Sequence, residues 1–311
     1  MSESKPRIVF FCNHHIGVQT IEKVHLQYSL IAVVTNPDKE QGRGRKMQPT
    51  EIKLKALELG IPVIEPDNLK DIAFYKNLKK LDADIFLVFA FKILPNELLE
   101  LPKIGSFNIH PSLLPKYRGA APINHTIING DKETGISTFL LEEKVDAGGI
   151  LLQEKFPLPH DITAGELTEI VSYKAPEIAL KTIELLISRN FKIIKQDIDE
   201  ATKAPKIHKE NCEIDFNKPA IVVKNFINGV SPEPGAWKIW DGKMVKFLKA
   251  IQHSDKSRGI PGDYKIFEKK FIVTCNPGEI EILQIQPESK RSMPIEDFIN
   301  GFRGYKKGRI E

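Results

Sequence analysis

Hydrophobic positions in the first half of the chain form short runs that alternate with amphipathic stretches. The apolar runs at 7–11, 30–35 and 82–92 predict strands, whereas the helical spacing of apolar residues at 18–29 and 67–80 predicts helices. The third run is almost continuously apolar, which is typical of a central strand covered on both faces. This alternation of strands and helices favours an α/β fold with a parallel sheet.

The stretch from Gly105 to Pro122, GSFNIHPSLLPKYRGAAP, carries the most distinctive polar residues. It begins as a strand, in which alternate residues share a face. Asn108 and His110 would therefore project together, while Phe107 and Ile109 point into the core. Prolines follow and should end the strand. The two polar side chains would then lie near the carboxyl end of a strand, where open α/β sheets usually bind ligands.

A carboxylate on a neighbouring turn is the third candidate of this group. Alternating residues predict a strand at 134–141, and another strand is expected at 150–156. Asp146 lies in the glycine-closed loop between them. From that turn, Asp146 could face the same pocket as the Asn and His side chains.

These three side chains suit acyl transfer. The amide of Asn108 can donate a hydrogen bond to a developing oxyanion, and His110 can exchange a proton near neutral pH. Asp146 can orient the imidazole. No nucleophile is evident beside them, since Ser112 is displaced along the loop, so direct attack of one substrate on another is favoured. The alternative is that Asn108 and His110 are buried groups that satisfy backbone hydrogen bonds.

A predicted helix and a connector follow. Thr163-Ala-Gly-Glu166 fits a capping box at the start of an amphipathic helix, which Pro176 is expected to kink or divide. Residues 188–210 lack a strong apolar period and are interpreted as a connector.

The C-terminal third predicts a small β-barrel. A helix is expected at 220–228, and short strands separated by turn residues are expected at 214–216, 236–239, 245–251, 271–274 and 280–285. Small Greek-key barrels often bind nucleic acid. Residues 206–311 hold 19 Lys and Arg against 14 Asp and Glu, a net charge of +5, whereas the first 205 residues sum to −1. Such a modest excess is compatible with either an RNA contact or an ordinary solvated surface.

Composition narrows the class of protein. With 311 residues, 41% hydrophobic and 28% charged, the chain suits two soluble domains. It has no apolar run near the roughly 20 residues that a membrane helix needs. The three cysteines lack metal-site spacing, which argues against disulfides and a zinc site. The first apolar run begins at Ile8, so we expect no targeting peptide and a bacterial cytoplasmic location.

The loop at 36–49 is polar and rich in glycine and basic residues. Its cations include Arg43, Arg45 and Lys46. It lacks the spacing of a phosphate-binding nucleotide loop. The two interpretations left are a contact with an RNA backbone and a solvated connection.

Several motifs together resemble the 10-formyltetrahydrofolate-dependent formyltransferases. They are Asn108-Ile-His-Pro-Ser-Leu-Leu-Pro115, Tyr117-Arg-Gly-Ala-Ala-Pro122, Glu133-Thr-Gly135 and Asp146-Ala-Gly148. The Gly-Arg-Gly-Arg-Lys loop, Ala204-Pro-Lys-Ile in the connector and Asn228-Gly-Val-Ser-Pro-Glu-Pro-Gly-Ala-Trp237 extend the resemblance over essentially the whole chain. They point to the members of this family that act on methionyl-tRNA.

The resemblance implies a Rossmann-like formyltransferase domain at 1–188, a linker at 189–207 and an OB-like tRNA-binding domain at 208–311. The expected substrates are 10-formyltetrahydrofolate and initiator methionyl-tRNA, and we expect a monomer without metal. The alternative is a sugar-nucleotide N-formyltransferase with the same folate donor.

The site residues implied by the resemblance fall into three groups. The catalytic group is Asn108, His110 and Asp146. The expected tRNA contacts are Arg43, Arg45 and Lys46. The expected folate contacts are Ser112, Leu113, Leu114, Pro115, Phe89, Ala90 and Phe91.

Overall fold

The computed structural model describes residues 5–41, 46–143 and 145–310. The chain divides into two compact units, which are described separately here. The first unit contains residues 1–119, 135–156 and 168–203, and the second contains residues 120–134, 157–167 and 204–311. The domain boundaries at 188 and 207 stay a prediction.

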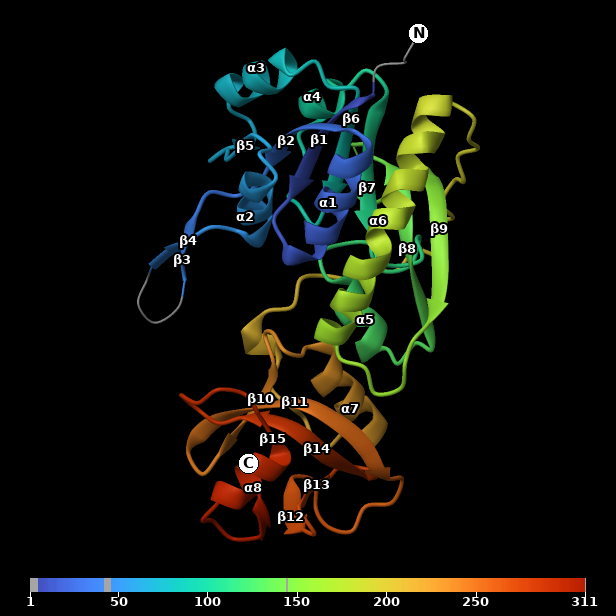
Figure 1. The fold of residues 1–311 in the computed structure, drawn as a ribbon. Coiled ribbons are helices and arrows are strands. Elements are labelled where there is room, and N and C mark those ends of the chain that lie inside the picture. Colours follow the sequence, from blue (N-terminus) through green and yellow to red (C-terminus); the bar gives the residue numbers. More distant parts are fainter. Residues whose placement is uncertain (1–4, 42–45, 144, 311) are drawn as a thin grey trace. The chain divides into compact units, whose positions relative to one another are not determined.

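A seven-stranded sheet forms the centre of the first unit (Figure 1). Its spatial order is β5-β2-β1-β6-β7-β8-β9. The first five of these strands are parallel, and β8 joins β7 antiparallel. The strands are β1 (Arg7–Cys12), β2 (Ser29–Val34), β5 (Val63–Ile64), β6 (Ile85–Phe89), β7 (Gly105–His110), β8 (Glu133–Leu140) and β9 (Ile150–Pro157). The predicted Rossmann-like arrangement is thereby confirmed.

Helices cover both faces of this sheet. Phe74 and Leu78 of α3 (Ile72–Lys80), and Leu98 of α4 (Asn96–Leu99), pack in one apolar cluster with Val9 and Phe86. Figure 1 shows α1 (Val18–Gln27) and α6 (Ala164–Ser188) in front of the sheet. The helix α2 (Glu51–Glu58) contacts α1. Because both faces are covered, the strands β1, β2 and β6 are almost wholly apolar, and β6 has no exposed residue.

Two smaller elements complete the first unit. A single 3-10 turn, η1 (His15–Gly17), precedes α1, and a short hairpin is formed by β3 (Lys39–Gln41) and β4 (Lys46–Gln48).

The second unit is built on a curled antiparallel sheet of order β10-β11-β14-β13-β12-β16, with β15 paired to β14. It confirms the prediction of an OB-like fold, here as a half-barrel. Its strands are β10 (Ala236–Trp240), β11 (Lys243–Ser254), β12 (Asp263–Phe267), β13 (Lys270–Thr274), β14 (Glu279–Gln286), β15 (Met293–Pro294) and β16 (Lys307–Arg309). Its helices are α5 (Pro122–Ile128), α7 (Ala220–Gly229) and α8 (Ile295–Gly301), with a 3-10 turn η2 (Lys209–Asn211), and α5 packs on α7.

Some sequence predictions for these elements were wrong. The expected strand at 214–216 is absent, since only an isolated bridge joins Glu213 to Trp237. The strand β12 and the helix α8 were not predicted. Near the C-terminus, the basic segment Lys307–Arg309 pairs with β12 as the outer strand of the sheet.

The helix α6 begins as predicted. The backbone amide of Thr163 donates to Oε2 of Glu166 at 2.8 Å, and the amide of Glu166 donates to Oγ1 of Thr163 at 3.2 Å, which completes the capping box. The helix then continues through Pro176 without division. No helix within the described residues is long and apolar enough to cross a membrane.

Candidate active site

The strand β7 brings two of the predicted catalytic side chains to the carboxyl edge of the sheet. It runs from Gly105 to His110 between the neighbours β6 and β8. Phe107 and Ile109 are fully buried, as the alternation predicts. Asn108 is half-buried, and its side-chain amide makes no hydrogen bond within the described part of the chain. Its donors are therefore free to meet a ligand.

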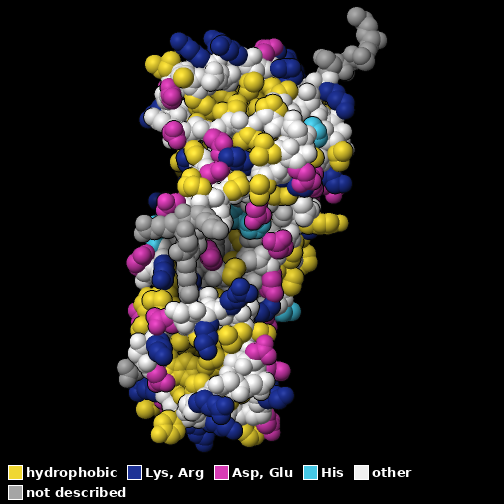
Figure 2. Space-filling view, turned by 60° about the vertical axis from the view of Figure 1, so that its left-hand side comes forward, with side chains coloured by type: hydrophobic (Ala, Val, Ile, Leu, Met, Phe, Trp, Pro, Cys, Tyr) yellow, Lys and Arg dark blue, Asp and Glu magenta, His cyan; other side chains and the backbone are white. Residues whose placement is uncertain are grey.

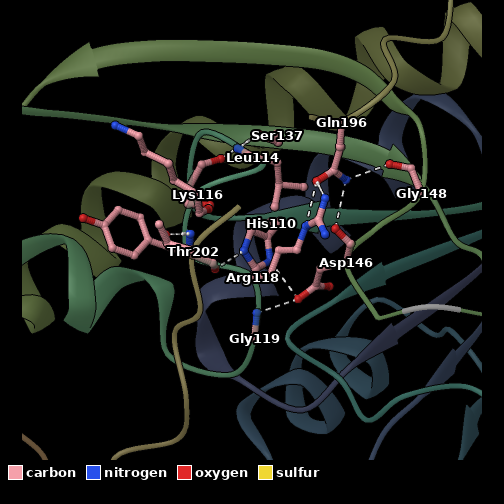
Figure 3. A network of polar contacts seen from close by, with 12 residues as sticks. His110, Leu114, Lys116, Arg118, Gly119, Ser137, Asp146, Gly148, Gln196 and Thr202 are labelled. Carbon is pink, nitrogen blue, oxygen red and sulfur yellow. Dashed lines mark hydrogen bonds and ion pairs between the residues drawn. The ribbon is translucent and has the colours of Figure 1, made fainter. Parts of the chain in front are cut away.

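His110 is held between two partners in a buried position. Its side chain is 4% exposed. The ring atom Nε2 lies 2.9 Å from the carbonyl oxygen of Tyr117, and Nδ1 lies 3.9 Å from Oδ2 of Asp146 (Figure 3). Because a carbonyl oxygen only accepts hydrogen bonds, Nε2 carries the hydrogen. In the neutral ring, Nδ1 is then the atom with a free lone pair, so it is the one able to take a proton.

Burial decides the protonation of this ring. Removal from water disfavours the imidazolium, so the pKa of His110 lies below its usual value of 6.5. The Asp146 carboxylate and the Tyr117 carbonyl act in the opposite direction and limit this decrease. At neutral pH the ring is thus a neutral base, with a carboxylate placed to stabilise its protonated form.

Asp146 reaches this position from an unusual backbone conformation. Its φ of 52° lies in the left-handed region that side chains with a Cβ rarely adopt. One carboxylate oxygen, Oδ2, accepts a hydrogen bond of 2.8 Å from the backbone amide of Gly119. Two residues further along the loop, Gly148 packs so tightly that an added Cβ would lie 1.8 Å from the carbonyl oxygen of Leu140. The glycine predicted to close this loop is therefore required by space.

Gln196 and Thr202, which lie in the connector, complete the polar network of Figure 3. The amide nitrogen of Gln196 donates to the carbonyls of Asp146 and Gly148 at 2.9 and 2.7 Å. Arg118 donates to the Gln196 side-chain oxygen through Nε and Nη2, at 3.0 and 2.7 Å. No periodic signal marks Gln196 or Thr202, because the connector has no apolar pattern.

The predicted folate loop after β7 is tied down by its own hydrogen bonds. The Ser112 hydroxyl donates to the Lys116 carbonyl at 2.7 Å, and this side chain is buried. The amide of Leu114 donates to the Ser137 hydroxyl, and its carbonyl accepts from Gln153. Leu113 is half-buried beside Gly135, where an added Cβ would lie 2.4 Å from the Leu113 side chain.

The carbonyl of Pro115, the last residue predicted for this loop, accepts from the amide of Thr202 at 3.4 Å. These contacts make the loop rigid.

The other predicted folate contacts follow β6. Phe89 is fully buried and pairs with Ile109 of β7. Ala90 is exposed and left-handed, with φ at 48°, and its carbonyl accepts from the amide of Asn13. Phe91 is half-buried, with its ring centroid 5.5 Å from that of Phe11. Of these three, Ala90 offers the most accessible surface.

Asn13 connects the edges of three parallel strands at this end of the sheet. Its side-chain oxygen accepts from the amide of Asn36 at 2.7 Å, and its own amide reaches Ala90. His14 and His15, which follow it, are already engaged: Nδ1 of His14 accepts from the Ile16 amide, and Nε2 of His15 lies 3.3 Å from Glu169.

The described residues contain neither a cluster of metal-ligating side chains nor a disulfide. There, no group of three or more His, Cys, Asp or Glu side chains is arranged to hold a metal ion. All three cysteines are buried and free, and burial raises the pKa of Cys12 to about 12. Burial also raises the pKa of Cys212, and it raises that of Cys275 to about 12, so all three thiols stay protonated at neutral pH.

The predicted tRNA contacts lie only partly within the described residues. Arg43 and Arg45 lie outside the described residues, and Lys46 begins β4. On the face shown in Figure 2, Lys and Arg side chains are interspersed with Asp and Glu instead of forming one continuous basic field. In the second unit, Tyr305 is 87% exposed beside the exposed cations Lys306 and Lys307.

The fold and this site define the class of protein. The chain belongs to the formyl transferase family: the family described as "Formyl transferase" matches residues 7–183, and "Formyl transferase, C-terminal domain" matches residues 206–303. Similarity to known relatives extends over nearly the whole chain. It is 38% identical to the methionyl-tRNA formyltransferase of Porphyromonas gingivalis, over 97% of each chain, and 40% identical to that of Chlorobium luteolum, over 89% of each.

Solved structures share the fold at lower identity. A sugar 3N-formyl transferase, crystallised in the presence of dTDP and 5-N-formyl-THF, has a TM-score of 0.68 and 24% identity, with 93% of this chain and 100% of that chain covered. This likeness supports the fold described above for each unit of the chain.

Proposed function

We propose that this chain transfers the formyl group of 10-formyltetrahydrofolate to the free amino group of initiator methionyl-tRNA, giving the formylated tRNA used to initiate translation. The family and the methionyl-tRNA formyltransferases that match nearly the full chain support this activity. The observation that carries the chemistry is the buried His110, with Nε2 fixed by a carbonyl and Nδ1 facing Asp146.

The reaction joins two substrates directly. The amine nitrogen attacks the formyl carbon, and the carbonyl oxygen becomes an oxyanion to which the Asn108 amide donates a hydrogen bond. The amine loses a proton to Nδ1 of His110. The bond between the formyl carbon and N10 then breaks as that proton passes to N10. No bond to the enzyme forms, in agreement with the lack of a nucleophile next to His110 among the residues that the structure describes.

Asp146 lowers the energy of the protonated intermediate state of the ring. Its Oδ2 lies 3.9 Å from Nδ1, too far for a hydrogen bond to the neutral ring but close enough for an ion pair once the ring is protonated. The hydrogen bond from Gly119 keeps the carboxylate in place. The pair is thus arranged to favour charge that develops during the reaction.

The formyl donor fits the chemistry of this edge of the sheet. Within the described residues no group pairs with the amide donors of Asn108, and Ala90, which follows β6, is exposed. We assign the donor to Ser112–Pro115 and to Phe89–Phe91. Because the side chains of Phe89 and Ser112 are buried, their contacts would come from the backbone.

The other predicted site residues are assigned to tRNA binding. We assign acceptor-stem contacts to Arg43, Arg45 and Lys46, and further tRNA contacts to the barrel at 208–311, joined to the catalytic domain 1–188 by the linker 189–207. The enzyme is proposed to act as a monomer in the bacterial cytoplasm, where its two substrates meet. Sedimentation of the pure protein tests the monomer.

Formation of N-formylmethionyl-tRNA from the two substrates tests the activity. The wild-type chain should formylate stoichiometrically when enzyme is in excess. His110→Ala should lose roughly 10²- to 10⁴-fold in single-turnover rate while it retains most of its tRNA affinity. If His110→Ala kept a near-normal single-turnover rate, the proposed role of this base would be wrong.

A further inference from the structure

We infer that Gln196 and Thr202, two residues of the connector, are positioning residues that hold the His110–Asp146 pair in its reactive geometry. The inference rests on the proposed function and deepens it. It gives the connector a part in catalysis beyond joining two folded units. All the contacts involved lie within the first unit.

Both partners of His110 come from strained backbone. Tyr117, whose carbonyl fixes Nε2, has a φ of 62°, and Asp146, whose carboxylate faces Nδ1, has a φ of 52°. Side chains with a Cβ adopt this left-handed region only where surrounding contacts hold them there. The two contacts to the imidazole therefore depend on whatever fixes these two residues.

The connector supplies those fixing contacts at Tyr117. The Thr202 hydroxyl accepts a hydrogen bond of 2.8 Å from the Tyr117 amide, and the Thr202 carbonyl accepts one of 2.8 Å from the Arg118 amide. The next amide in the chain, that of Gly119, is the one that binds the Asp146 carboxylate. Thr202 thus anchors the segment that contacts both members of the pair.

Gln196 supplies the fixing contacts at Asp146. Its two amide hydrogens reach the carbonyls on either side of Ala147, and its oxygen accepts two hydrogen bonds from Arg118. Gln196 is only 9% exposed, and all its polar capacity is used inside the protein. It thereby links the Asp146 loop to the 117–119 segment.

Thr202 and Gln196 thus hold the two backbone segments that contact His110. Loss of the Gln196 amide leaves the Asp146 loop free to relax from its left-handed conformation, which would move the carboxylate away from Nδ1. Such a movement weakens proton transfer without removing any group that touches substrate. The expected signature is a decrease in kcat with little change in KM.

A double-mutant cycle distinguishes positioning from general damage. Single-turnover formylation of methionyl-tRNA is measured for Gln196→Leu, Asp146→Ala and the combination. Gln196→Leu alone should lower the rate about 10- to 100-fold, and it should lower the rate of Asp146→Ala by less than about threefold further. If the two effects multiplied, Gln196 would not act through Asp146 and the inference would fall.

Matched variants identify the atoms involved. Gln196→Glu keeps oxygens for Arg118 but removes the donors to the loop carbonyls, so it should be impaired like Gln196→Leu. Thr202→Val should be impaired about tenfold, and Thr202→Ser, which keeps the hydroxyl, should be close to wild type. Ile198→Gln, an exposed connector change, serves as the control. If Gln196→Leu does not fold, Thr202→Val against Thr202→Ser in the same cycle decides the outcome.

A substrate-free measurement separates this inference from the proposed function. In ¹⁵N-histidine spectra, displacement of Asp146 in Gln196→Leu should shift the titration of His110 to lower pH, as loss of the carboxylate should in Asp146→Ala, because the carboxylate raises the pKa of the ring. An unchanged titration in Gln196→Leu would overturn the inference. A wild-type enzyme that fails to formylate methionyl-tRNA would instead overturn the proposed function.

Discussion

Replacing Asp146 by Asn isolates the charge that faces His110. The substitution keeps the shape of the side chain and an oxygen that can accept from the Gly119 amide, while it removes the negative charge 3.9 Å from Nδ1. Both side chains are largely buried, at 4% and 11% exposed, so solvent screens the interaction only weakly. The effect on rate can therefore be worked from Coulomb's law.

The magnitude follows from the distance between the two charges. At an effective dielectric constant of about 20, unit charges separated by this distance interact by about 4 kcal/mol. If the ring carries a full positive charge in the transition state, loss of the carboxylate charge lowers the rate about 10³-fold. If proton transfer is half complete and the ring carries half a charge, the rate falls about 30-fold. We expect Asp146→Asn to fall within this range.

The assay is rapid-quench formylation with enzyme in excess and both substrates saturating. The dissociation constant for methionyl-tRNA should change by less than about threefold, because Asp146 makes no proposed contact with RNA. Asp199→Asn, which removes a charge from an exposed position of the connector, is the control and should match wild type. A single-turnover rate for Asp146→Asn within fivefold of wild type would refute the electrostatic argument.

Three further predictions concern the remaining parts. Asn108→Ala should lower kcat by roughly 10²- to 10³-fold in the same assay, with KM unchanged, since it removes an oxyanion donor. Replacing Arg43, Arg45 and Lys46 together by Gln should weaken methionyl-tRNA binding and reduce the slope of log affinity against log salt by about 2 to 3, as read from filter-binding titrations. Because burial lowers the pKa of His110, the unfolded chain takes up a proton on this ring at higher pH than the folded chain. The free energy of unfolding should therefore fall as pH drops below about 6.5. At pH 7, ¹⁵N-histidine spectra should show a neutral ring with hydrogen on Nε2.

The first unit was largely predictable because its strands and helices differ in hydrophobic period. The runs ending at Phe11 and Phe89 are covered on both faces, so they give unbroken apolar strands. The position of Asn108 and His110 at the end of β7 follows from the same pattern. The approach of His110 to Asp146 does not, because it depends on two left-handed residues, Tyr117 and Asp146, that no local pattern specifies.

The second unit was less predictable because short strands carry weak signals. The isolated bridge at Glu213 looks like a strand in sequence, since buried Ile214 and Phe216 alternate with polar residues. The strand β16 consists wholly of exposed residues, so it has no hydrophobic alternation to predict it. Gln196 was missed for a related reason: its four hydrogen bonds are to partners far away in sequence.

A competition between two formyl acceptors tests whether methionyl-tRNA is the substrate of this enzyme. With 10-formyltetrahydrofolate as donor, methionyl-tRNA and an amino-sugar nucleotide are supplied together, and kcat/KM is measured for each. We expect kcat/KM for methionyl-tRNA to exceed that for the amino-sugar nucleotide by several orders of magnitude. Preferential formylation of the amino sugar, with methionyl-tRNA left unmodified, would contradict it.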